Sequence, residues 1–251
     1  MKKVNSSGNY SPDTFIYKNT LLKFMDNRGE KSFITLPKFA AKLYDKMMQL
    51  EPLQIQRSQI AELLLQQINE GSLLDVGTGH GRLLIEINKL NPKIELYGLD
   101  ISEKMINLAK TNLKDIKADL QQGNITNTNY KSNYFDIITC TGSFYLWNSP
   151  IEGLNEIHRI LKPNKIALLF ESHKDYDKSN LKKEIKKNLS KEGFFNRRLV
   201  PYFLNKQLKM TYDINELKNI LNKSLFENNF SIKKITLANL PIWLKIELTK
   251  E

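Results

Sequence analysis

Cysteine is almost absent from this chain of 251 residues, which contains Cys140 alone. No disulfide can form within the chain, and this composition is typical of proteins from the reducing cytoplasm. Long apolar runs are also missing. The run at residues 166–170 is far shorter than the roughly 20 residues that a membrane-spanning helix requires. The first residues lack the apolar stretch of a secretory signal. We therefore expect a cytoplasmic protein with no membrane span.

Arginine is scarce too, although the formal net charge is +11. The positive charge comes mostly from lysine, whereas a surface built to bind phosphates favours the forked guanidinium of arginine. We interpret the charge as a solvated basic surface and do not expect a nucleic-acid partner. The apolar content of 41% is ordinary for a globular protein, so we expect one compact core.

Strand-like and helical segments alternate after Gly71. The strand-like segments are residues 72–76, 94–99, 117–122, 134–140 and 165–171, then 231–238 and 242–248 with Pro241 between them. This regular alternation predicts an α/β fold, with a doubly wound and mostly parallel sheet that carries helices on both faces. Before it, apolar residues at helical spacing predict two helices within 36–68. We expect Gly71 to end the second of them.

The chain divides into two regions by this pattern. Residues 1–71 are expected to form a lead-in and N-terminal cap helices, and residues 72–251 the main domain. About forty residues separate the fifth strand from a helix whose start is marked by Asp213, far more than the usual four to six. We therefore interpret residues 172–212 as an inserted helical cap segment, lysine-rich in its first half and aromatic and basic in its second.

Three glycines alternate between the first strand and the helix after it, in the segment DVGTGHG at residues 75–81. Glycine permits positive φ angles and lets the backbone approach a ligand. At the carboxyl end of a parallel strand, three of them predict a bound molecule. The dinucleotide fingerprint needs a sixth-position glycine where Arg82 stands, and the G-K-[ST] of a P-loop is absent. A nicotinamide cofactor and a nucleoside triphosphate are therefore disfavoured.

An acidic residue, Asp100, ends the second strand. A carboxylate at this place can accept hydrogen bonds from both hydroxyls of a ribose, which also orients the sugar. Capping of the next helix is the alternative role, but Ser102 is better placed for it, directly before Glu103. The glycine-rich turn and Asp100 together predict a nucleoside ligand.

The ordered set of motifs resembles the class I S-adenosylmethionine-dependent methyltransferases. Besides DVGTGHG and the acidic residue, the set includes GNI at residues 123–125, YFDII at 134–138 and EIHRILKP at 156–163. The resemblance covers residues 36 to 248 approximately. It implies a seven-stranded Rossmann-like sheet with one antiparallel strand, S-adenosylmethionine as cofactor and S-adenosylhomocysteine as product.

The resemblance also implies which residues bind the cofactor. The glycines line its methionine portion with Asp75 near the ammonium group, Asp100 takes the ribose, and Asn124 stands where the family usually has an aspartate at the adenine. A second departure is Pro163-Asn164-Lys165, where the family has Pro-Gly-Gly. The predicted cofactor-binding residues are Asp75, Gly77, Thr78, Gly79, Gly81, Asp100, Ile101, Met105, Asn124, Ile125, Cys140 and Thr141.

Methyl transfer from a sulfonium requires an acceptor atom held roughly 3 to 3.5 Å from the methyl group. A metal is not required, and a general base is needed only when the acceptor loses a proton. His173 is the first candidate for a base, because its unperturbed pKa of about 6.5 suits neutral pH; an exposed loop position is the alternative. The other catalytic candidates are Tyr44 and Tyr145, and the substrate candidates are Ser143, Trp147, Arg197, Arg198 and Tyr202.

Three functions stay open at this point. The first is methylation of a small molecule by a monomer or homodimer. The second is methylation of RNA or another macromolecule through the basic surface. Against it, the chain lacks the Asn/Asp-Pro-Pro-aromatic run used for exocyclic amines, and no proline precedes Cys140. The third is a non-catalytic binding module, because fold alone does not settle function.

Overall fold

The computed structural model describes Asp45 and residues 48–251. Seven strands form one sheet in the order β3-β2-β1-β4-β5-β7-β6. Pairing is parallel from β3 through β5, whereas β7 runs antiparallel to both of its neighbours. The strands are β1 Gly71–Val76, β2 Ile94–Asp100, β3 Ala118–Gln122, β4 Phe135–Thr141, β5 Leu161–Ser172, β6 Phe230–Leu237 and β7 Leu240–Thr249. The predicted seven-stranded, mostly parallel sheet is confirmed.

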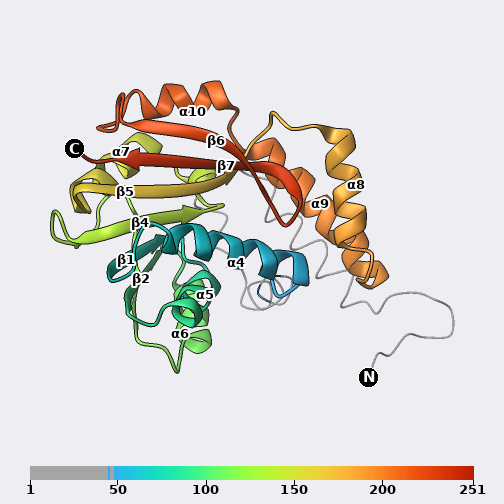
Figure 1. Cartoon of the computed structure of the whole chain (residues 1–251), viewed down its shortest axis with the longest axis horizontal. Helices are drawn as coiled ribbons and strands as arrows, with labels where there is room; N and C mark the ends of the chain where they lie inside the picture. The colour runs from blue at the N-terminus through green and yellow to red at the C-terminus, as the bar shows by residue number, and fades with distance from the viewer. Residues whose placement is uncertain (1–44, 46–47) are drawn as a thin grey trace.

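Helices cover both faces of this sheet (Figure 1). Helices α4, α5 and α6 pack on one face and α7 and α10 on the other, whereas α8 and α9 lie beyond the carboxyl ends of the parallel strands. The helices are α4 Glu51–Leu65, α5 Arg82–Leu90, α6 Glu103–Asn112, the short 3₁₀ helix η1 Phe144–Leu146, α7 Pro150–Ile160, α8 Lys178–Asn188, α9 Phe194–Met210 and α10 Ile214–Leu221.

The central strands divide the core in two, because successive side chains of a strand point to opposite faces. In β1, Leu74 and Val76 join the cluster under α7 and α10, while Leu73 joins the cluster under α4 and α5. All three are almost fully buried. Near-continuous apolar strands of this kind are expected where a parallel sheet is covered on both sides.

Helices α6, α7 and α10 each begin after a residue of a type that commonly caps helices, but of these three residues only the one before α10 makes the capping hydrogen bond. The side chain of Asp213 accepts a hydrogen bond from the backbone N–H of Glu216, and the Glu216 carboxylate accepts one from the N–H of Asp213. This reciprocal pair is a capping box, at the helix start that Asp213 marks in the sequence. Ser149 and Ser102 occupy cap positions, but neither side chain makes a capping hydrogen bond.

Two local expectations are wrong. Gly71 has a φ of +105°, yet it is the first residue of β1, since α4 has already ended at Leu65. Pro241 lies inside β7, whose tight connection to β6 is made by Ala238 and Asn239, with φ of 48° and 61°. Two successive left-handed residues match the right-handed twist of a hairpin.

None of the helices in the described part of the chain is both long and apolar enough to cross a bilayer. In the same part, no group of histidine, cysteine and acidic side chains is arranged to hold a metal ion.

Candidate functional site

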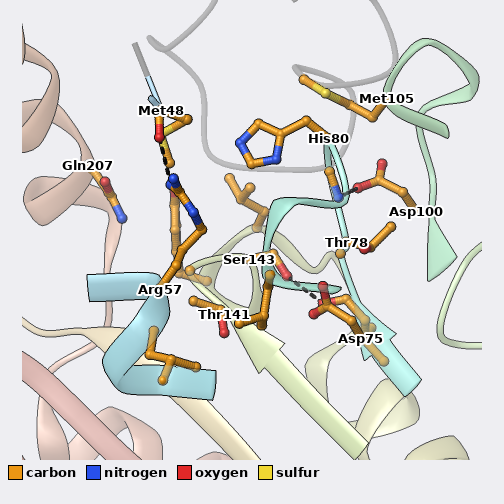
Figure 2. A pocket seen from close by; sticks show the side chains of 18 of the residues that line it. Met48, Arg57, Asp75, Thr78, His80, Asp100, Met105, Thr141, Ser143 and Gln207 are labelled. Atoms are coloured by element: carbon orange, nitrogen blue, oxygen red, sulfur yellow. Dashed lines mark hydrogen bonds between the residues drawn. The ribbon is translucent and has the colours of Figure 1, made fainter. Parts of the chain in front are cut away.

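A cavity of about 300 Å³ opens at the carboxyl ends of the parallel strands, where the chain leaves β1, β2 and β4. This is the edge at which the strand order reverses, between β1 and β4. Open α/β sheets bind ligands at such a switch point. Its walls come from the glycine turn, the N-terminal half of α4, one face of α9 and the start of β7 (Figure 2).

The three glycines of the turn have different surroundings. All three have positive φ angles. A Cβ on Gly79 would meet no atom closer than 3.9 Å, so this residue leaves open space on the cavity side. A Cβ on Gly77 would lie 2.1 Å from Oγ of Ser143, and one on Gly81 would lie 2.3 Å from the Leu113 side chain of the segment after α6. Gly79 is thus the glycine that leaves the backbone open to a ligand.

Asp100 holds the turn and faces the cavity at the same time. One of its carboxylate oxygens accepts a hydrogen bond from the N–H of Gly79, and the other accepts one from the N–H of Ser102, both at 2.8 Å. Burial raises the pKa of Asp100, although these two hydrogen bonds oppose the rise. Each carboxylate oxygen has a second lone pair, so two further donors can bind.

Two more acidic residues are buried nearby. Burial raises the pKa of Asp75 to about 7, and Asp75 lines the cavity. Burial also raises the pKa of Glu171, at the end of β5, to about 8. Its Oε1 accepts hydrogen bonds from the N–H groups of Ser143 (2.9 Å) and Phe144 (2.8 Å). Glu171 thereby fixes the loop after β4, and with it a wall of the cavity.

Helix α4 places a cation at the cavity. Arg57 is 9% exposed, and its Nη1 donates to the carbonyl of Met48 at 2.6 Å. Figure 2 shows the Arg57 side chain rising from α4 along the cavity, with His80 of the glycine turn between its guanidinium group and Asp100 in this view. Burial, together with the charges of Arg57 and Arg82, lowers the pKa of His80 to about 4, against the opposing charge of Asp45. His80 is therefore neutral near pH 7.

The segment before α4 is attached to the glycine turn by an ion pair. The Arg82 guanidinium makes two hydrogen bonds to Asp45, at 2.7 and 3.0 Å. Asn112 of α6 donates to the carbonyl of His80 at 2.9 Å. Two parallel N–H···O bonds between arginine and a carboxylate fix orientation as well as distance.

The opposite end of the cavity is apolar. Helix α9 contributes one side, with residues spaced as on a single helical face, and the hairpin contributes another. The lining residues at this end are Val200, Phe203, Leu204, Gln207, Leu240, Ile242 and Trp243. None of these residues is charged.

Most of the predicted site residues are brought together by the structure. The predicted residues that line the cavity are Asp75, Gly77, Thr78, Gly79, Asp100, Ile101, Met105, Asn124, Ile125, Thr141, Ser143, Tyr145 and Trp147. They come from the carboxyl ends of β1, β2 and β4, from the loops that follow β1, β2, β3 and β4, and from the first turn of α6. Tyr44 lies outside the described residues.

Other predicted residues lie away from the cavity. Gly81 packs against α6 instead, as its contact with Leu113 shows. Cys140 is fully buried and its Sγ lies 3.1 Å from Oγ of Ser143, so it backs the cavity wall without lining it. Arg197, Arg198 and Tyr202 project from other sides of α9.

His173 also lies away from the cavity. The expected exposed position is wrong, because the residue is fully buried. Its N–H donates to the carbonyl of Ile242 at 3.1 Å, which places it behind the start of β7. Its Nδ1 accepts a hydrogen bond from the N–H of Asp175. Burial lowers the pKa of this imidazole. A base that meets an acceptor in the cavity cannot be His173 in this arrangement.

The main lining residues that the sequence did not reveal are those of α4 and β7. Arg57 carries a signal, as one of few arginines in an otherwise lysine-rich chain. Trp243 carries another, because tryptophan occurs only twice and Trp147 lines the same cavity. Neither signal gives a position, since both segments lie far in sequence from the glycine turn.

Known proteins match this chain over its central part. A family model described as a methyltransferase domain matches residues 69–224. An uncharacterized methyltransferase of Bacillus subtilis, YdaC, is 30% identical over 108 residues, which cover 43% of this chain and 60% of that protein. A demethylmenaquinone methyltransferase of Deinococcus radiodurans is 32% identical over 101 residues, which cover 39% and 42%. The chain thus spans about half the length of these curated relatives.

A solved structure resembles nearly the whole fold. It is a putative S-adenosyl-L-methionine-dependent methyltransferase from Methanococcus maripaludis, with a TM-score of 0.60 and 26% sequence identity, covering 85% of this chain and 93% of that one. The family model alone spans more than half of the residues. With the sheet order, the glycine turn and the cavity at its switch point, the match shows that the chain belongs to the S-adenosylmethionine-dependent methyltransferase family.

Proposed function

We propose that this chain transfers a methyl group from S-adenosylmethionine to a small, largely apolar acceptor. The observation that carries the proposal is a single cavity with two unlike ends, a polar end at the glycine turn and an uncharged end between α9 and the hairpin. A cofactor bound at one end of such a cavity and an acceptor bound at the other can be in direct contact. The name of the relative from Deinococcus radiodurans includes demethylmenaquinone, which supports a small-molecule acceptor.

The polar end suits the nucleoside. Asp100 has lone pairs available for both ribose hydroxyls, because each of its oxygens accepts only one backbone hydrogen bond. The open space beside Gly79 lets the ligand approach the protein backbone. Ile101, Asn124 and Ile125 line the cavity further along and would contact the adenine. The Oδ1 of Asn124 already accepts from the N–H of Thr126, so this side chain has a fixed orientation.

The amino-acid portion of the cofactor would lie between Asp75 and Arg57. An ionised Asp75 attracts an ammonium group, and Arg57 attracts a carboxylate from the opposite wall. We assign Arg57 as the partner of the cofactor carboxylate, with neutral His80 beside it. A guanidinium held by the Met48 carbonyl is already oriented, so less side-chain entropy is lost on binding.

The acceptor would occupy the uncharged end. Phe203 and Trp243 offer flat apolar surfaces there, and Tyr145 and Trp147 approach from the loop after β4. Lining by apolar and aromatic side chains with few polar groups is the usual character of a small-molecule pocket. Tyr145 is the catalytic candidate that remains in the cavity, and we propose that its hydroxyl orients the acceptor atom.

The chemistry demands little from the protein besides placement. The bound cofactor supplies an electrophilic methyl group on a positively charged sulfur. The side chains of α9 and the hairpin would hold the acceptor in line with it and exclude water; Thr141 and Ser143 also line the cavity. Positioning of this kind accounts for a large share of the rate in two-reactant reactions.

Cofactor carrying a radiolabelled methyl group, incubated with the protein and a cell extract, tests the proposal. We expect the label in the fraction extractable by organic solvent. A matched Tyr145→Phe variant should transfer label on the order of tenfold or more slowly, with unchanged affinity for S-adenosylhomocysteine. Label in the RNA or protein fraction alone would contradict a small acceptor, and binding without any transfer would favour the non-catalytic alternative.

A further inference from the structure

The positive charge of the chain is concentrated in one segment. Residues 178–210, which span α8 and α9, contain eight lysines, two arginines and two glutamates, so they hold +8 of the formal +11. The other residues together hold only +3. A general lysine bias would spread the charge evenly along the chain. The observed charge is concentrated in this one segment instead.

The two helices enclose a second, basic hollow. It has a volume of about 830 Å³ and lies between α8 and α9. Four lysines and one arginine line it, and none of its lining residues is acidic. They are Lys178, Lys182, Lys186, Arg197 and Lys209. Within the described part of the chain, no carboxylate forms an ion pair with any of these five residues.

Helix α9 belongs to both cavities. Its residues Val200, Leu204 and Gln207 face the methyltransferase cavity, whereas Arg197, Pro201, Asn205 and Lys209 line the basic hollow at four-residue spacing. A partner bound on α8 and α9 therefore lies one helix away from the acceptor end. In Figure 1, α9 lies between α8 and the sheet.

We propose that the lysine-rich face of α8 and α9 docks on the surface of an anionic lipid bilayer. The face is complementary to a polyanionic partner, because its lysines are exposed and no acidic residue lines the hollow. The choice of a bilayer rests on the proposed function: an apolar acceptor partitions into membranes, and the uncharged end of the cavity lies against α9. Docking would bring that end close to the lipid phase.

A nucleic acid fits these two helices less well. Recognition of phosphates favours arginine forks, yet Arg197 is occupied by the carbonyl groups of Leu189 and Ser190 at the end of α8. Single-stranded nucleic acids also need exposed aromatic rings for stacking. On the described parts of α8 and α9, Tyr202 is the large apolar side chain with substantial exposure, and Lys206 lies over its ring. Lysine point charges suit the diffuse field of a lipid surface.

The docking is electrostatic. Leu181 and Leu189 on the apolar side of α8 are buried against the protein's own core and cannot insert into lipid. Each lysine close to an anionic surface strengthens binding about fivefold, and salt screens this effect. Binding should therefore be lost at high salt.

Co-sedimentation of the full chain with lipid vesicles tests the proposal. Vesicles of phosphatidylcholine containing phosphatidylglycerol are compared with pure phosphatidylcholine at low and high salt. One variant replaces Lys178, Lys182, Lys186 and Lys209 by glutamine. The matched control makes the same change at Lys93, Lys110, Lys117 and Lys131, which are exposed on the other end of the sheet.

We expect salt-sensitive binding to the anionic vesicles only, reduced on the order of a hundredfold or more in the first variant and far less in the control. Both variants should keep the wild-type affinity for S-adenosylhomocysteine, so a failure of the cofactor site would be seen separately. Absence of vesicle binding, or equal losses in both variants, would overturn the proposal. Retention on poly(U) RNA without vesicle binding would overturn it in favour of a nucleic acid.

Discussion

Asp100 is the residue on which the proposed cofactor site depends most. Asp100→Asn should weaken binding of S-adenosylhomocysteine by about ten- to a hundredfold, because hydrogen bonds to a charged acceptor are worth roughly 1.5 to 3 kcal/mol each. Isothermal titration calorimetry measures the change. Asp119→Asn is the control, since it removes the same charge from an exposed position on the neighbouring strand β3. Equal affinities of wild type and Asp100→Asn would refute the ribose contact.

Asp75 should make cofactor affinity depend on pH. Its pKa of about 7 in the free protein means that much of it is protonated below neutral pH. An ammonium group favours the ionised form, so the affinity for S-adenosylhomocysteine should rise from pH 6 to pH 8 and then level off. In Asp75→Asn the affinity should be weaker and flat over this range. Titrations at a series of pH values decide this, and a rise that persists in the variant would assign it to another group.

The sequence predicts residues of the site well where one short segment carries the signal. The glycine turn and Asp100 lie within or directly after strands whose apolar pattern is clear. His173 shows where such reading fails, because its burial depends on the start of β7, about seventy residues further along the chain. Arg57 was missed for the same reason, as only the packing of α4 brings it to the cavity.

At the scale of elements, Glu171 connects β5 to the loop after β4. Between pH about 4.5 and about 8 the folded protein keeps this carboxyl protonated, while the unfolded chain ionises it. The contribution of Glu171 to stability is thus present below pH 4.5 and is lost as pH rises to about 8. Glutamine removes this titration and keeps an oxygen that can accept from Ser143 and Phe144.

Glu171→Gln should therefore stabilise the protein relative to wild type at pH 8 to 9, by on the order of a few kcal/mol, with a much smaller difference near pH 5. Urea unfolding across this range measures the difference. The exposed Glu227→Gln is the control and should show no such trend. A difference that does not change with pH would mean that Glu171 titrates alike in both states.

Elements with regular patterns were predictable, and their connections less so. The mostly parallel sheet follows from the alternation of strands and helices. The start of the helix at Asp213 also follows from its local sequence, where Glu216 stands three residues after the cap. The sequence places the break between the last two strands at Pro241, which is wrong because Pro241 lies inside β7. The chain instead turns at Ala238 and Asn239, whose positive φ angles no local rule favours for alanine.

The whole molecule should gain stability from its ligand. Saturation with S-adenosylhomocysteine at about a hundredfold its dissociation constant contributes about 2.7 kcal/mol, which for a chain of this size raises the melting temperature by roughly 5 to 10 °C. Differential scanning fluorimetry measures the shift. NAD⁺ and ATP serve as controls and should give none, because the turn lacks both of their phosphate-binding patterns. An equal shift with NAD⁺ would contradict the cofactor assignment.

The turn of the β6–β7 hairpin is held from two sides. Its Ala238 donates a backbone N–H to the side chain of Gln59 on α4 at 2.8 Å, and its carbonyl accepts from Asn188 of α8 at 2.6 Å. Helices α4 and α8 are thus both hydrogen-bonded to this one loop. A shift of α4 that widens the cavity would therefore carry the hairpin turn and α8 with it, unless one of these two hydrogen bonds breaks first.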